Sequence, residues 1–110
     1  MRIGGNVAAT LQQKATDATF NAIGERVSSW FDLVILSGWL DLTTGDSKYT
    51  HNAKLQDSTH VFLCDYAPVD RVTGNKRLVV NGNAYDVLLI DDPMEMHQHL
   101  EIYLKLIGGV

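Results

Sequence analysis

The stretch from residue 76 to residue 107 constrains the fold most, because it joins a hairpin signal to a long alternating strand. Asn81-Gly82 lies between two runs rich in β-forming residues. An Asn-Gly pair favours a type I′ turn, in which both central residues need a positive φ. Beyond Pro93 the residues that point one way are Leu100, Ile102, Leu104 and Leu106, and those that point the other way are His99, Glu101, Tyr103 and Lys105. This pattern predicts a β-hairpin followed by a half-buried antiparallel strand.

Three earlier segments also have strand patterns. Residues 7–14 alternate with Val7, Ala9 and Leu11 on one face, although their Ala and Gln content would also suit a helix. Residues 58–66 are rich in β-forming side chains. In residues 30–43 one face holds Val34, Leu36, Gly38, Leu40 and Leu42, and the other holds Ile35, Ser37, Trp39 and Asp41. Gly38 in mid-strand indicates a bend, a bulge or the close approach of another backbone. Residues 15–25 fit either a short helical turn or part of a hairpin.

The spacing of these segments predicts the fold class. About six short strands with turns between them and little helix are typical of a sandwich or a small barrel. Closure into a barrel removes the unpaired strand edges that such a chain would otherwise expose. We therefore predict an all-β fold, a small antiparallel β-barrel of about six strands with one long polar loop. We expect residues 1–110 to form a single domain, a length that can bury a core without disulfides or metal.

The long polar loop covers residues 43–57 and has no hydrophobic period. Its residues are Thr43, Thr44, Gly45, Asp46, Ser47, Lys48, Tyr49, Thr50, His51, Asn52, Ala53, Lys54, Leu55, Gln56 and Asp57. The two acids and two lysines in the loop cancel in charge. Loops of this length inside a compact domain are usually functional or disordered. The sequence leaves open both a solvated connection and a functional moving loop.

Composition narrows the possible functions. Thirteen Asp and Glu against nine Lys and Arg give a formal net charge of -4, which argues against a general nucleic-acid binder with a basic face. The single cysteine, Cys64, cannot form a disulfide within the chain and is expected to be a buried apolar side chain. The sequence lacks an apolar run of signal-peptide length and the ~18 apolar residues that span a bilayer. We expect a soluble protein that is not exported.

A few polar groups could support chemistry. His97 and His99 form a pair at strand spacing, so both rings could face one side and bind a metal ion, although a metal site needs three or four converging ligands. The run Asp91-Asp92-Pro93 is typical of a turn that ends a strand. The sequence has neither a phosphate-binding glycine pattern nor a nucleophile elbow. We therefore predict no catalytic residue, no metal ligand and no cofactor.

Two aromatic residues lie on the polar faces of alternating strands. Trp39 and Tyr103 are both placed there by the alternation. Exposed aromatic side chains on a small domain are common where proteins meet. We predict that both side chains are exposed and contribute to a subunit interface.

Together these features resemble the head-closure, or stopper, proteins of the head–tail adaptor group in long-tailed phages. The resemblance runs from about residue 7 to residue 109. It rests on an early β segment, Trp30 opening a strand, the long polar loop and a Ser-Thr-His-Val-Phe strand at residues 58–62. Its most specific part is the ending: Gly-x-x-Tyr-x-Val at residues 82–87, Asp-Asp-Pro, and a long last strand closing on Gly-Gly.

The resemblance implies a small β-barrel that assembles into a ring, commonly of twelve copies, below the portal and its adaptor. Such a ring closes the DNA channel after packaging and provides the surface on which the tail docks. In the family the long loop projects into the channel, which corresponds to residues 43–57 here, and its lysines would allow transient contact with packaged DNA. The implied partners are the portal-adaptor ring, a tail terminator or other tail protein, and further copies of the chain. The implied location is the head–tail connector of the virion, reached from the host cytoplasm, with no membrane, enzyme activity or cofactor.

Two main alternatives remain open, beside a generic ligand-binding β-barrel as the residual one. Tail terminators and other tail-completion proteins of similar size are much alike in sequence, so the chain could belong to the tail side of the connector. A small metal-dependent enzyme that uses His97 and His99 is the alternative from a different class.

Overall fold

The computed structural model describes residues 7–15, 19–20, 22–24, 26–27, 29–42 and 58–110. The strands are β1 (Val7–Lys14), β2 (Thr19–Phe20), β3 (Arg26–Val27), β4 (Trp30–Leu42), β5 (His60–Asp65), β6 (Lys76–Val80), β7 (Asn83–Asp91) and β8 (His99–Gly109). A single 3-10 turn, η1 (Pro93–Glu95), lies between β7 and β8. Among the described residues no helix is long and apolar enough to cross a membrane.

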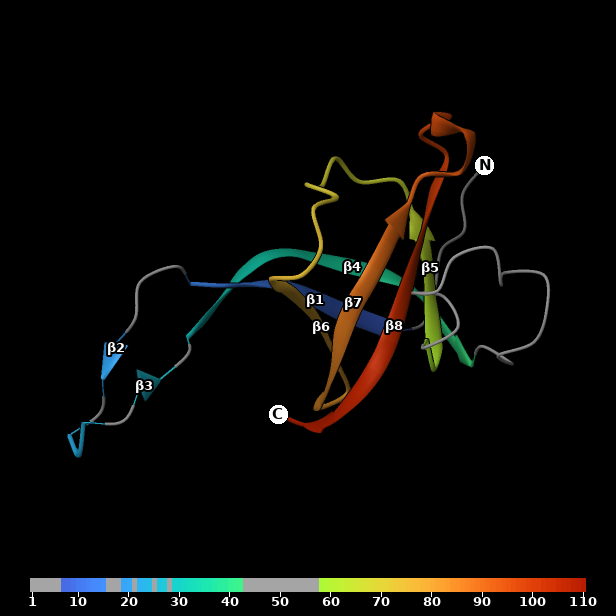
Figure 1. Ribbon diagram of the computed structural model, residues 1–110. Helices are drawn as coiled ribbons and strands as arrows, with labels where there is room; N and C mark the ends of the chain where they lie inside the picture. Colours follow the sequence, from blue (N-terminus) through green and yellow to red (C-terminus); the bar gives the residue numbers. More distant parts are fainter. Residues whose placement is uncertain (1–6, 16–18, 21, 25, 28, 43–57) are drawn as a thin grey trace.

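Six of the strands close into an antiparallel barrel in the order β1-β4-β5-β8-β7-β6, and β6 pairs with β1 to complete it. This confirms the predicted small all-β barrel. The remaining strands, β2 and β3, form a two-stranded sheet that Figure 1 shows at a distance from the barrel. Of the two interpretations of residues 15–25, the pairing of β2 with β3 supports the hairpin.

The β6–β7 connection is the tight turn that the sequence predicts. Asn81 and Gly82 have φ values of 52° and 80°, the positive pair that a type I′ turn needs. Val80 pairs with Asn83 directly across this turn. The register of the hairpin places Leu78 and Tyr85, which pair with each other, in the core.

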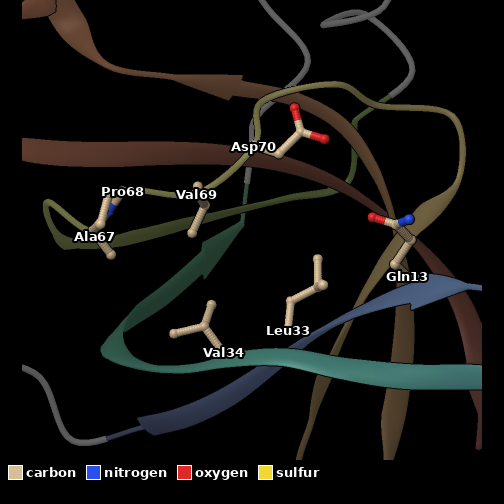
Figure 2. Close-up of a pocket in the computed structure, with 7 residues that line it drawn as sticks. All are labelled: Gln13, Leu33, Val34, Ala67, Pro68, Val69 and Asp70. Atoms are coloured by element: carbon tan, nitrogen blue, oxygen red, sulfur yellow. The ribbon is translucent and has the colours of Figure 1, made fainter.

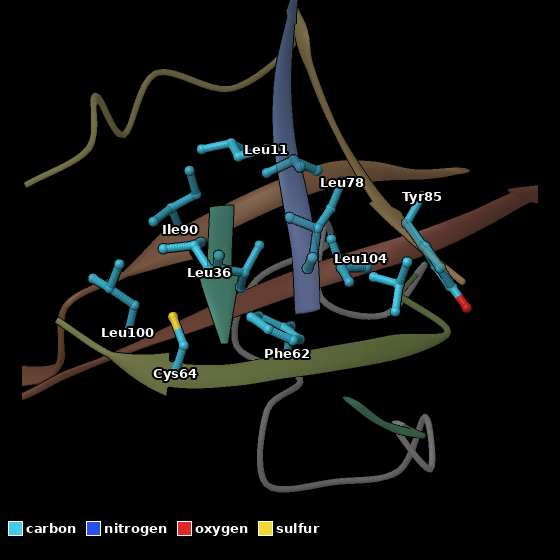
Figure 3. Close-up of a cluster of buried hydrophobic side chains, with 13 residues drawn as sticks. Leu11, Leu36, Phe62, Cys64, Leu78, Tyr85, Ile90, Leu100 and Leu104 are labelled. Carbon is cyan, nitrogen blue, oxygen red and sulfur yellow. The ribbon is translucent and has the colours of Figure 1, made fainter. Parts of the chain in front are cut away.

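The core fills the barrel with alternate residues from all six strands, as Figure 3 shows. Its members are Ala9, Leu11, Leu36, Phe62, Cys64, Leu78, Val80, Tyr85, Val87, Ile90, Leu100, Ile102 and Leu104. The predicted burial of Cys64 is confirmed at 1% exposure. Burial of aliphatic and aromatic side chains in this interior is the main term that stabilises the barrel.

Gly38 marks a close approach of two backbones, which is one of the interpretations that its mid-strand position allowed. A Cβ atom at this position would lie 2.1 Å from the carbonyl oxygen of Leu63 on β5. The bulge in β4 lies elsewhere, at Leu33, because Leu11 pairs with Val34 while the next residue of β1 pairs with Asp32. Glycine at position 38 lets β4 and β5 come together. The bulge bends β4 at Leu33.

The barrel has two different ends. One end, which we call the strap end, carries the connection from β5 to β6, residues 66–75, and the β7–β8 connection, residues 92–98. The opposite, hairpin end carries the Asn81-Gly82 turn and the last residues of β4 and β8. Leu42 and Leu106 have the alternation of core residues but are 70% and 45% exposed, because they lie beyond the last buried layer at this end.

Candidate interaction surface

The outer wall of β4 carries exposed apolar side chains. Trp39 is 47% exposed and Ile35 is 68% exposed, and the alternation of β4 directs both away from the core. The predicted exposure of Trp39 is confirmed. Its role in a subunit interface stays a prediction.

The predicted exposure of Tyr103 is wrong, because its side chain is only 5% exposed. Tyr103 lies on β8 between Val61 of β5 and Leu89 of β7. Its hydroxyl donates a hydrogen bond of 2.8 Å to Glu101 Oε1. The aliphatic neighbours and this bond explain how a residue on the polar face of an alternating strand becomes buried. The predicted loop at residues 43–57 lies outside the described residues.

His97 and His99 do not converge. Nδ1 of His97 lies 2.5 Å from Asp92 Oδ2, whereas Nε2 of His99 lies 3.1 Å from Glu101 Oε2. Among the described residues no three His, Cys, Asp or Glu side chains form a group that could hold a metal ion. This geometry gives no support to the alternative in which both rings bind one metal ion.

We call residues 92–98 the methionine turn, because Met94 and Met96 are 88% and 56% exposed in it. Its backbone is unusual: Met94, Glu95 and His97 have φ values of 55°, 52° and 56°. Each residue with a side chain costs roughly 1–2 kcal/mol in this left-handed region. The turn can persist only if contacts around it offset that cost.

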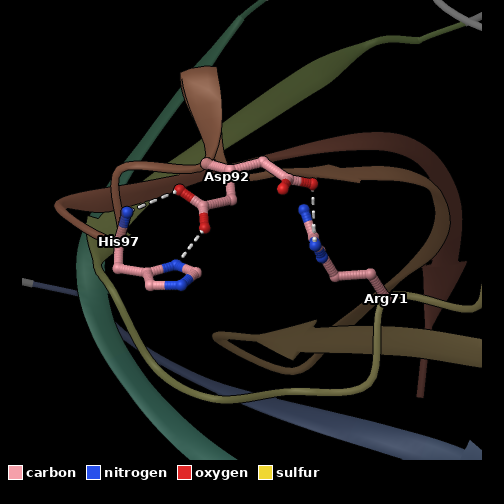
Figure 4. Close-up of polar contacts among 4 residues, drawn as sticks. Arg71, Asp92 and His97 are labelled. Atoms are coloured by element: carbon pink, nitrogen blue, oxygen red, sulfur yellow. Dashed lines mark hydrogen bonds and ion pairs between the residues drawn. The ribbon is translucent and has the colours of Figure 1, made fainter.

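Asp92 supplies the main contact. Its carboxylate, nearly buried, accepts hydrogen bonds from the His97 ring at 2.5 Å and from the His97 backbone N–H at 3.1 Å, as Figure 4 shows. Arg71 reaches the turn from the other connection and lies 3.4 Å from Glu95 Oε1. The rings of Tyr66 and His97 also pack with centroids 4.5 Å apart. The two connections at the strap end thus hold each other in place.

At this end of the barrel the pKa values of two neighbouring acids are shifted in opposite directions. Burial of the Asp92 carboxyl favours its neutral form, but the hydrogen bonds from His97 outweigh burial and lower the pKa of Asp92. Burial raises the pKa of Asp91, and the nearby carboxylates of Glu101 and Asp92 raise it further. Asp92 is therefore the anion that holds the turn, while ionisation of Asp91 works against the fold.

We call residues 66–75 the strap, because they cross the mouth of the barrel from β5 to β6. Lys76, at the start of β6, points into the mouth and is only 1% exposed. Its Nζ donates to the carbonyl oxygen of Val72 at 2.6 Å and to Asp70 Oδ2 at 3.2 Å. The backbone N–H of Val72 and the Lys76 ammonium lower the pKa of Asp70. A buried cation that is hydrogen-bonded in this way fixes the strap over the barrel.

A pocket of about 320 Å³ lies between the strap and β4. Figure 2 shows Leu33 and Val34 of β4 facing strap residues 67–70 across it, with Gln13 of β1 at the side. We call it the mouth pocket. Its walls are mainly apolar, and Asp70 is the charged group at its edge. Such a concave surface can accept an apolar side chain.

Three of these features were not predicted from the sequence. The mouth pocket depends on the bulge at Leu33, which only the pairing of β1 with β4 reveals. The contact between Asp92 and His97 spans a turn whose conformation no motif predicts. Lys76 had a detectable signal, because it shares the alternation of the core residues Leu78 and Val80.

Comparison with known proteins supports the fold. No protein-family model matches the sequence, and no curated protein matches it at a significant level. Among solved structures the chain is similar to protein SF1141 from Shigella flexneri 2a, whose structure was determined in solution. The two share 18% sequence identity with a TM-score of 0.65, and the match covers 94% of each chain. At this identity the similarity concerns the barrel alone.

Proposed function

We propose that the chain is a structural head-completion, or stopper, protein of a long-tailed phage. In this role copies of the barrel form a ring below the portal and its adaptor, close the DNA channel and offer the tail a docking surface. The protein acts by assembly rather than by catalysis. The proposal rests first on the resemblance of the sequence to that family.

One observation of the fold carries the proposal further. β4 and β5 are hydrogen-bonded neighbours, and Leu42 pairs with His60 at the hairpin end. Two neighbouring antiparallel strands need only about 2–5 residues to connect them. The chain instead places residues 43–57 there. The barrel does not need this segment for its topology, which supports a separate task such as occupation of a channel.

The exposed apolar wall of β4 is consistent with assembly. Trp39 and Ile35 remain exposed in the single chain, and aromatic residues are enriched in the centres of protein interfaces. A closed barrel has no free strand edges, so subunits must meet through side chains and connections. The outer wall of β4 is a suitable surface for such contact.

Phage particles assembled without this protein provide the test. A stopper predicts DNA-filled heads that lose their genome, and purified protein added to them should restore retention. Sealed, full heads without tails would overturn the proposal and support a tail terminator or other tail-completion protein.

A variant separates the task of the loop from that of the barrel. Replacement of residues 43–57 by a short Asn-Gly turn should leave the barrel folded, because Leu42 and His60 already pair. We expect this variant to bind the connector but to leave the channel open. Full genome retention with this variant would show that the loop has no closing role.

A further inference from the structure

Arg77 of β6 does not form an ion pair with the acid that lies opposite it. Its direct neighbour on β7 is Asp86, and opposite charges at such positions usually attract each other. Within the described residues, however, no ion pair joins these two side chains. The guanidinium of Arg77 instead reaches over β1, the strand between β6 and β4, and its Cζ lies 4.4 Å from the centre of the Trp30 ring. Arg77 is therefore positioned by something other than the nearest carboxylate.

A chain of hydrogen bonds holds the guanidinium over Trp30. Its Nε donates a hydrogen bond of 2.7 Å to Gln12 Oε1. Gln12 Nε2 in turn donates to Asp32 Oδ1 at 2.9 Å, which orients the amide with its oxygen toward Arg77. Asp32 and Gln12 pair directly across β4 and β1, so these contacts follow the register of the barrel wall. Stacking on a ring and a hydrogen bond at Nε together restrict the guanidinium to one orientation.

The far edge of this guanidinium still has donors to offer. Gln12 uses the N–H on Nε, which leaves the N–H groups on Nη1 and Nη2. In the part of the chain that the structure describes, these two groups have no acceptor. Their parallel N–H bonds match a pair of oxygen atoms on one anion. Because Arg77 is already ordered, an anion that binds it pays less of the entropic cost of binding.

A second cation lies on the same outer face. Lys14 pairs directly with Trp30 across β1 and β4, is exposed, and alternates with Gln12 on the face of β1 that points away from the core. A terminal phosphate group has three strong acceptor oxygens, so it can accept from the arginine and from the lysine at once. A carboxylate has only the two oxygens that the arginine would occupy. The two cations therefore fit a terminal phosphate better than a carboxylate.

The acids nearby do not cancel this charge. Asp32 already accepts a hydrogen bond from Gln12. Asp86 lies on β7, whereas the guanidinium extends in the other direction, over β1. Arg77 and Lys14 against Asp32 leave an excess of positive charge on this part of the wall. The chain as a whole has a formal net charge of -4, so this excess is local and suits one small anion rather than a long polyanion.

We propose that Arg77 and Lys14 together bind a terminal phosphate group, with Arg77 held in place over Trp30. The terminal amino groups of Arg77 donate to two of the phosphate oxygens, and the Lys14 ammonium donates to the third. The ligand is either inorganic phosphate or the phosphate of a small monoester, which share this chemistry. The inference does not depend on the proposed stopper role, because it needs only the wall formed by β6, β1 and β4.

Side-chain NMR of the whole chain tests the site. The Nε–H resonances of Arg77 and Arg71 are followed while sodium phosphate replaces sodium chloride at constant ionic strength. We expect the Arg77 resonance to shift along a saturating curve. Arg71 is the matched control in the same sample and should not shift, because Glu95 lies 3.4 Å away and offsets its charge. The lack of a saturating shift at Arg77, or an equal shift at Arg71, would overturn the proposal.

Two variants separate the charge of the site from its geometry. Arg77→Lys keeps the charge but removes the parallel donors, so phosphate binding should weaken roughly tenfold or more. Trp30→Leu keeps every charge but removes the ring, and it should also weaken binding. Unchanged affinity in both variants would show that charge alone attracts the anion and would overturn the site. The backbone amide spectrum of each variant checks that the barrel remains folded.

Competition experiments identify the source of the phosphate. Adenosine monophosphate should displace inorganic phosphate from Arg77 if the ligand is a monoester, and it should fail to do so if the site takes the free ion alone. A short DNA duplex without terminal phosphates should compete poorly, because an esterified backbone phosphate has fewer free oxygens. Stronger competition by the duplex than by either small ligand would overturn the terminal-phosphate site in favour of backbone binding.

Discussion

Gly38→Ala should destabilise the barrel strongly, because the added methyl group has no room. The new Cβ would lie 2.1 Å from the Leu63 carbonyl oxygen and 2.9 Å from both the Leu63 carbonyl carbon and Phe62 Cζ. Relief of the first contact requires β4 and β5 to separate by more than 1 Å, relative to ordinary van der Waals distances of 3.4–4 Å. Overpacking costs typically about 1–3 kcal/mol. We expect about 3 kcal/mol here, because a paired backbone opposes the methyl group.

Urea unfolding followed by fluorescence of Trp30 and Trp39 measures this change. A loss of about 3 kcal/mol corresponds to a midpoint lower by roughly 1–3 M urea, given typical slopes for small proteins. The thermal midpoint should fall by about 10–20 °C. Gly109→Ala is the matched control, because nothing lies within 4 Å of its added Cβ. We expect the control to stay within about 0.5 kcal/mol of the unmodified chain.

Phe62→Leu, combined with Gly38→Ala, separates the two sources of the clash. The smaller side chain removes the contact with Phe62 Cζ but leaves the Leu63 carbonyl in place. The double variant should therefore remain less stable than Phe62→Leu alone by most of the ~3 kcal/mol expected for Gly38→Ala. Full recovery in the double variant, or a Gly38→Ala protein as stable as the parent, would refute the close approach of the two backbones.

The other predictions concern buried and charged groups. The thiol of Cys64, whose pKa is raised to about 11 by burial and by Asp65, should resist iodoacetamide at pH 8 until urea unfolds the chain; rapid labelling of the folded protein would contradict its burial. Lys76→Met should cost roughly 1–3 kcal/mol and speed amide exchange in the strap, whereas the exposed Lys105→Met should change neither; an unchanged strap would contradict its anchoring by Lys76. Because the pKa of Asp92 is lowered in the folded state, its carboxylate stabilises the fold at a pH above the pKa of the unfolded chain, and this stabilisation is lost as the pH falls through the pKa of the folded chain. The loss of stability caused by Asp92→Asn should therefore shrink between pH 5 and pH 2. A loss of stability that is the same at both pH values would refute this. The raised pKa of Asp91 has the opposite sign, so Asp91→Asn should stabilise the protein at pH 7 and lose that advantage in acid; a destabilised variant at pH 7 would refute it.

Local patterns in the sequence predicted the strands well. The alternation around Leu100, Ile102 and Leu104 reflects a strand with one face in the core, and these three residues are almost fully buried. The Asn81-Gly82 turn was predictable because few residues tolerate two successive positive φ values. Such signals depend on neighbours along the chain.

Features that depend on distant strands were not predictable from the same patterns. Nothing local indicates that β8 lies between β5 and β7, or that Leu33 has no partner on β1. The error at Tyr103 has the same origin. Alternation places its side chain outside the core, but it is covered by Leu89 of the preceding strand and by Val61, which comes from a strand distant in sequence.

The candidate surface was predicted only in part. Trp39 could be found because an aromatic residue on a polar face stands out from its neighbours. The exposure of Met94 could not be found, because the turn after Pro93 has no alternating pattern from which a methionine could depart. Its exposure follows from the turn that Asp92 holds. The mouth pocket needs three separate elements, β1, β4 and the strap, so no single stretch of sequence contains it.

The strand order also sets when the chain can fold during synthesis. β8, the last strand made, pairs with both β5 and β7, and until it emerges from the ribosome each of those strands has an unpaired edge. Closure also joins β1 to β6, strands far apart in sequence, which makes folding slow. The barrel can therefore close only once β8 has been made, and before that there is a period in which open edges can pair with other nascent copies. A chaperone that covers β5 and β7 during this period should raise the yield of folded protein.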